Sequence, residues 1–151
     1  MKRIYRYYCI VTAVLVMIAG NSAALEFSDF HGRWKLLYRG NYGYEFRFAK
    51  NYQAVCILYL QNNAVVFKGV YTLDNPQTLR INISQMKNVD NINTVYGAGG
   101  FSNVNSSYFL FHAALVKKDT KKMLELKPLS IVIDGITSEG YFEPVILLQK
   151  Q

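Results

Sequence analysis

Alternation of apolar and polar side chains is the feature that most constrains the fold of this chain. The run 44–48 places aromatic residues on one face and the charged Glu45 and Arg47 on the other, and in the run 79–84 Leu79, Ile81 and Ile83 alternate with polar residues. A period of two is typical of a β-strand with one buried face and one solvated face. The chain is therefore predicted to be all-β.

The turns between such runs are rich in Asn, Asp, Gly and Pro, which separates the predicted strands clearly. Strands are expected at 33–38, 44–48, 53–60, 64–73, 79–84, 107–117, 123–134 and 140–149. Short connections between consecutive strands favour a meander. About eight strands in one domain predict a closed antiparallel up-and-down barrel, and a two-sheet β-sandwich is the alternative.

Two polar segments interrupt this pattern. The stretch 88–107 contains Gly97-Ala98-Gly99-Gly100 and is predicted to be a long loop, a class that is often functional. The basic run 117–122 lies between two apolar runs and is predicted to be the tip of a hairpin.

Residues 1–24 have the composition of a removable signal peptide. Lys2, Arg3 and Arg6 precede an apolar run from Cys9 to Gly20, and Asn21-Ser22-Ala23-Ala24 then supplies the small residues that a signal peptidase accepts. We expect cleavage near Ala24, a secreted or periplasmic protein, and a single mature domain over 25–151.

Removal of that segment changes both the charge and the cysteine content. Three of the 17 basic residues leave and all 10 acidic residues stay, so the mature net charge is 14 − 10 = +4. This is too modest to indicate a nucleic-acid partner. Cys56 would be the only cysteine left, inside the apolar run 54–58, where a buried and unreactive thiol is expected.

Two segments resemble the small bacterial lipocalin-like domains of the calycin group. Phe30-His31-Gly32-Arg33-Trp34-Lys35-Leu36 contains the Gly-x-Trp of the first lipocalin strand, and Lys68-Gly69-Val70-Tyr71-Thr72-Leu73-Asp74 resembles a hairpin of that family. The resemblance implies a β-barrel that binds a small apolar molecule, with Trp34 packed across its closed end. Larger lipocalins also stack an arginine from near the last strand on this tryptophan, whereas Lys150 is the only basic residue near the end of this chain.

The sequence offers little material for catalysis, so we expect no enzyme, no cofactor and no metal. His31 and His112 are the only histidines, and neither stands at metal-ligand spacing from another ligand type. The carboxylates are scattered, and no nucleophile motif is present.

Two functions remain open at this level. In the first, the barrel carries a small hydrophobic ligand, and alternation gives the candidate lining residues Phe46, Phe48, Cys56, Phe67, Tyr71, Ile81 and His112. In the second, the barrel is filled with side chains, and the protein is an envelope or extracellular interaction or inhibitor module that acts through the loop 88–106 and the turn 117–122.

Overall fold

A computed structural model describes residues 24–151, so the predicted signal peptide lies outside the described residues except for Ala24. The elements are α2 (Phe27–Phe30), β1 (Gly32–Tyr38), β2 (Tyr42–Phe48), β3 (Gln53–Leu60), β4 (Asn63–Asn75), β5 (Thr78–Val89), the 3₁₀ turn η1 (Ile92–Thr94), β6 (Ser102–Lys118), β7 (Lys121–Ile133), β8 (Ile136–Thr137) and β9 (Ile146–Lys150). Within residues 24–151, no helix has the length and hydropathy that a membrane-spanning helix requires.

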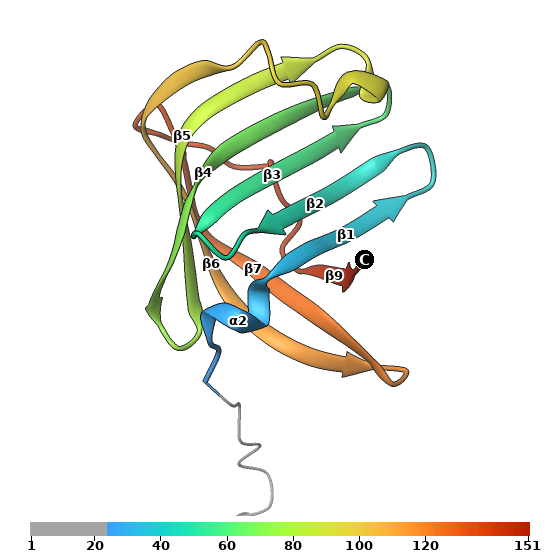
Figure 1. Cartoon of the computed structure of the whole chain (residues 1–151), viewed down its shortest axis with the longest axis vertical. Helices are drawn as coiled ribbons and strands as arrows, with labels where there is room; N and C mark the ends of the chain where they lie inside the picture. Colours follow the sequence, from blue (N-terminus) through green and yellow to red (C-terminus); the bar gives the residue numbers. More distant parts are fainter. Residues whose placement is uncertain (1–23) are drawn as a thin grey trace, which may run out of the picture.

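The strands form a closed barrel (Figure 1). The sheet has nine strands in the order β6-β5-β4-β3-β2-β1-β9-β7-β8, all paired antiparallel, and β6 also pairs with β7. Because β8 pairs only with β7, the other strands close the ring and β8 is an extra strand outside it. The predicted up-and-down barrel is confirmed, and the sandwich alternative is wrong.

The alternation seen in the sequence selects the inward face of each strand. In β2 the inward residues are Tyr44, Phe46 and Phe48, and all three belong to the buried core. Across the barrel, Phe109, Phe111 and Ala113 of β6 are also fully buried. The core is therefore aromatic on two opposite walls, as expected for a barrel whose interior is filled by side chains.

Trp34 of β1 belongs to the buried core and connects β1 to α2. This indole is fully buried, and its Nε1 donates a hydrogen bond of 2.6 Å to the carbonyl of Phe30 in α2. The neighbouring Gly32 has φ +117°, a conformation that favours glycine. A Cβ atom at Gly32 would lie 3.0 Å from Cε of the Lys150 side chain, so a larger residue would also crowd this lysine. The Gly-x-Trp pattern thus has a local structural reason.

Three strand boundaries differ from the sequence prediction by five residues or more, at the end of β5 and at the starts of β6 and β9. The predicted strand 140–149 is wrong over its first half, because only Ile146–Lys150 is strand and residues 138–145 form an irregular mouth segment. Pro144 has no amide hydrogen for a ladder, and Gly140 has φ +87°, so this stretch leaves the sheet. The loop predicted at 88–107 spans only residues 90–101, because β5 continues to Val89 and β6 begins at Ser102.

Candidate functional site on the outer wall

The residues predicted to line a lumen separate into two groups. Phe46, Phe48, Cys56, Phe67, Tyr71 and Ile81 all belong to the buried core of the barrel. His112 does not share this face, because Phe111 and Ala113 on either side of it point into the core and His112 is only partly buried. The run around His112 is apolar on both sides, so alternation in the sequence could not fix its direction.

The inward aromatic rings contact one another across the barrel. Phe46 of β2 lies 5.8 Å from Phe111 of β6, and Phe67 of β4 lies 4.9 Å from Phe109 of β6, measured between ring centroids. Both pairs have the edge-to-face geometry of packed aromatic cores. At the height of these four rings, side chains of β2 and β4 are in direct contact with side chains of β6.

The mouth segment adds a further ring to this core. Phe142 packs against Tyr44 and Phe46 on one wall and against Phe109 and Phe111 on the other, at centroid distances of 5.2 to 6.1 Å. In Figure 1 the segment that leads into β9 passes behind β3. The lumen beside these walls is thus occupied by a side chain of the chain itself.

Two tyrosines hold the mouth segment in place through Glu143. The hydroxyl of Tyr38 donates a hydrogen bond of 2.7 Å to Glu143 Oε2, and the Glu143 amide donates to the hydroxyl of Tyr44. The bond to Glu143 raises the pKa of Tyr38 to about 12, with desolvation contributing in the same direction. These contacts fix Phe142 from the β1 and β2 side.

Outside the barrel, the loop 90–101 folds back onto the sheet. Val95 is buried against outward residues of β3, β4 and β5, including Ile57, Val66 and Val89. This satellite cluster explains why outward positions of these strands are apolar. The loop is therefore a packed part of the outer wall, and its Tyr96 is brought next to β1 and β2.

Glu45 is the centre of a polar cluster on that wall. The sequence places it on the solvated face of β2, yet its side chain is 0% exposed, so the prediction of a wet position is wrong. Oε1 accepts from Arg47 Nε at 2.6 Å, and Oε2 accepts from Arg33 Nη2 at 2.9 Å and from the Tyr59 hydroxyl at 2.8 Å. Tyr96 from the loop completes the cover with a contact of 3.2 Å to Oε2.

These partners keep Glu45 ionised. Burial by itself would raise the pKa of Glu45, but hydrogen bonds from Arg33, Tyr59 and Arg47 outweigh it and lower the pKa to about 2. The bond to Glu45 in turn raises the pKa of Arg33. Burial, followed by bonds to Tyr96 and Glu45, raises the pKa of Tyr59. A carboxylate this acidic, with both oxygens engaged, is a poor proton acceptor near neutral pH.

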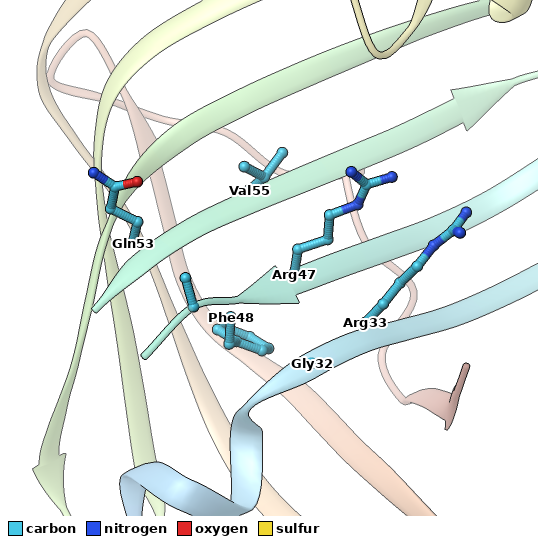
Figure 2. Close-up of a pocket in the computed structure, with 7 residues that line it drawn as sticks. Gly32, Arg33, Arg47, Phe48, Gln53 and Val55 are labelled. Carbon is cyan, nitrogen blue, oxygen red and sulfur yellow. The ribbon is translucent and has the colours of Figure 1, made fainter. Parts of the chain in front are cut away.

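An open groove of 540 Å³ lies beside this cluster (Figure 2). Arg33 and Arg47 extend in the same direction from neighbouring strands along its edge, and Gln53 and Val55 of β3 stand on its other side. The two arginines are directly paired across β1 and β2, and Val55 is the next partner on β3. The groove thus crosses β1, β2 and β3, and its lining includes two cations, one apolar side chain and one amide side chain.

No family model, curated protein or solved structure matched this chain. Among residues 24–151, no three His, Cys, Asp or Glu side chains come together as a set of metal ligands.

Sequence reasoning identified some of these parts but not their assembly. The basic turn lies, as predicted, at the tip of the β6–β7 hairpin, where Lys122 Nζ is 3.3 Å from Asp29 Oδ1. The alternation in 44–48 did put Glu45 and Arg47 on one face. Tyr96, which is 51 residues away from Glu45 in the chain, gave no signal in the sequence that it would join them.

Proposed function

We propose that the mature chain is an exported, non-enzymatic binding module that uses the outer wall of a filled, lipocalin-like barrel. The observation that carries this proposal is Phe142 in the lumen, in contact with rings from both β2 and β6. A carrier needs space between these walls, and here side chains of the protein take that space. The outer wall, by contrast, has an ordered loop and an open groove with two oriented cations.

Export and the absence of catalysis belong to the same proposal. The signal-like composition of residues 1–24 supports a secreted or periplasmic site of action. The ionised and fully engaged Glu45 supports binding over acid–base chemistry. A soluble partner and association with the cell envelope are both compatible with an outer-wall surface.

A carrier of small apolar molecules is the second candidate, and the mouth of the barrel favours it. Phe142 and Tyr141 are only partly buried, and a pocket of 200 Å³ lies between Tyr141, Tyr44 and Leu58. If the mouth segment moved outward, the aromatic residues it now contacts would line a cavity. In that case the sequence-predicted residues from Phe46 to Ile81 would contact a ligand.

Binding of a neutral apolar probe separates the two candidates. The mature protein is titrated with N-phenyl-1-naphthylamine, whose fluorescence rises in apolar sites. Because this probe is uncharged, the arginines of the outer wall do not attract it. We expect no saturable rise for the wild type. Saturable binding to the wild type with one site per chain, abolished by a bulky substitution such as Cys56→Phe in a folded variant, would establish the carrier instead.

Two phenylalanine variants supply the matched controls. Phe142→Ala removes a ring from the lumen and is expected to create an apolar cavity that takes up benzene, detected by shifts of core methyl signals in NMR spectra. Phe101→Ala removes a ring from the outer-wall loop and should bind no benzene. Equal behaviour of the two variants would contradict the assignment of Phe142 to the lumen.

A further inference from the structure

Positive charge exceeds negative charge at the outer-wall groove. Arg33, Lys35 and Arg47 surround one carboxylate, Glu45, so the cluster carries 3 − 1 = +2. Among residues 24–151, Glu45 is the only carboxylate that forms ion pairs with these three cations. This surplus lies on a single face, although the net charge of the mature chain is modest.

Both arginines are oriented before any ligand arrives. Arg47 Nε donates a hydrogen bond to Glu45, and the centre of the Tyr96 ring lies 4.3 Å from the guanidinium carbon of Arg47. Arg33 is held by Glu45 and by the Tyr96 hydroxyl, which accepts from Nη2 at 2.8 Å. A fixed guanidinium loses little side-chain entropy when it binds an anion, so orientation of this kind increases affinity.

The same arginines remain accessible to solvent. Their side chains are 40% and 39% exposed for Arg33 and Arg47, and both line the groove. Within the described chain, the terminal nitrogens of Arg47 have no hydrogen-bond partner, since its one hydrogen bond uses Nε. A guanidinium with free terminal donors matches the oxygens of a phosphate group.

The charge continues along the wall beyond the groove. Arg33, Arg47, Val55 and Lys68 are successive cross-strand partners on β1 to β4, so their side chains form one outward row. Lys68 lies 3.8 Å from the centre of the Phe101 ring, which Lys87 also approaches at 4.8 Å. Lys68 is therefore the third cation of this row, on the opposite side of Val55 from Arg47. The apolar side chain of Val55 between them suits the carbon skeleton of a ligand.

We propose that this groove is a binding site for a phosphate ester, in which Arg47 and Arg33 hold the phosphate oxygens and Val55 contacts the organic part. The inference rests on the proposed function, because it assigns a ligand chemistry to the outer-wall surface. The phosphate can belong to a soluble metabolite or to a lipid headgroup. The chemistry of recognition is the same in both cases.

Calorimetric titration at low ionic strength tests the site with inorganic phosphate and glycerol 3-phosphate as probes. We expect one site per chain for glycerol 3-phosphate, and Arg47→Gln should weaken its binding about tenfold or more, as expected for loss of a charge-assisted hydrogen bond. Arg47→Lys keeps the charge beside Glu45 but loses the planar fork, so it should fold normally and still bind more weakly. Circular dichroism and Trp34 fluorescence check that each variant is folded.

Arg80→Gln is the matched control. Arg80 also pairs with one carboxylate, Asp74, and also lies over a tyrosine ring, at 4.7 Å from Tyr108. It is not part of the groove, so its loss should leave binding unchanged. Equal weakening by Arg80→Gln and Arg47→Gln would show general charge attraction and overturn the site, as would the lack of any binding to the wild type at millimolar ligand.

Vesicles identify the source of the phosphate. Co-sedimentation with phosphatidylglycerol vesicles, but not with phosphatidylcholine vesicles, and its loss in Arg47→Gln would assign a lipid headgroup. Binding of glycerol 3-phosphate without vesicle binding would assign a soluble ester. The probe experiment on the lumen is independent, so a carrier that also binds phosphate would refute the proposed function and leave this site intact.

Discussion

The ammonium group of Lys150 lies 5.3 Å from the centre of the Trp34 ring, and the two residues are partners across β9 and β1. A lysine of the last strand thus lies over the tryptophan ring of the first strand. The contact links the last strand to the first at the point where the barrel closes. Cation–π contacts are strongest with tryptophan and with a partly desolvated cation.

Lys150→Ala should therefore destabilise the fold by about 0.5–1 kcal/mol, the usual value of such a contact. The chain has one tryptophan, so chemical unfolding followed by fluorescence reports directly on Trp34. Lys150→Arg should retain most of the stability. Lys127→Ala, which removes a half-exposed lysine from β7, is the control, and an equal loss in that variant would refute the role of the ring contact.

Stability should fall with acid because of Glu45. Its pKa is lowered from an ordinary value of 4.5 to about 2 in the folded chain, so its contribution is complete above about pH 5 and is lost as the pH falls towards 2. At pH 7, Glu45→Gln should cost about 3 kcal/mol, because Arg33, Arg47 and Lys35 lose their buried counter-charge. The variant should also show a weaker dependence on pH between 5 and 2. Urea unfolding at a series of pH values measures both effects, and parallel curves for the two proteins would contradict them.

Gly69 should tolerate no side chain. A Cβ at this position would lie 1.9 Å from the carbonyl oxygen of Asn82 on β5, so Gly69→Ala forces the β4 and β5 backbones apart. We expect a loss of at least about 2 kcal/mol. Gly99 in the outer-wall loop has no atom within 4 Å of a Cβ, and Gly99→Ala should change stability by less than about 0.5 kcal/mol. Thermal unfolding of the two variants provides the comparison, and similar transitions would contradict the close approach of β4 and β5.

Cys56 should be unreactive in the native protein. It is fully buried, and burial raises the pKa of its thiol well above the ordinary value. A disulfide reagent such as 5,5′-dithiobis(2-nitrobenzoate) should modify Cys56 very slowly at pH 8 and rapidly in 6 M guanidinium. Rapid reaction without denaturant would show that the core opens at this position.

The sequence predicted most of the strands because strand alternation is a local property. In β3 the predicted and observed ranges agree, since Gln53 and Leu60 are bounded by turn residues on both sides. Prediction failed for 140–145, where Tyr141, Phe142 and Val145 are apolar but the segment lies outside the sheet. Phe142 is apolar because it fills the lumen from a loop, and a single sequence does not distinguish that environment from a strand.

The candidate site was harder to predict because it depends on contacts between distant segments. Alternation put Glu45 and Arg47 on one face and indicated that both would be solvated. What removes Glu45 from water is the loop that carries Tyr96, together with Arg33 and Tyr59 from the neighbouring strands. None of these partners can be paired with Glu45 by spacing.

The amino-acid sequence by itself determined that this chain forms antiparallel strands with one buried face, because a period of two fixes the direction of each side chain relative to its own strand. Only the tertiary structure decided which irregular segments fill the inside of the barrel and cover its outside. The position of Phe142 in the lumen and of Tyr96 over Glu45 depends on how two irregular segments pack onto the closed sheet. Such packing is set by burial and hydrogen bonding between residues far apart in the chain, which a local pattern does not record.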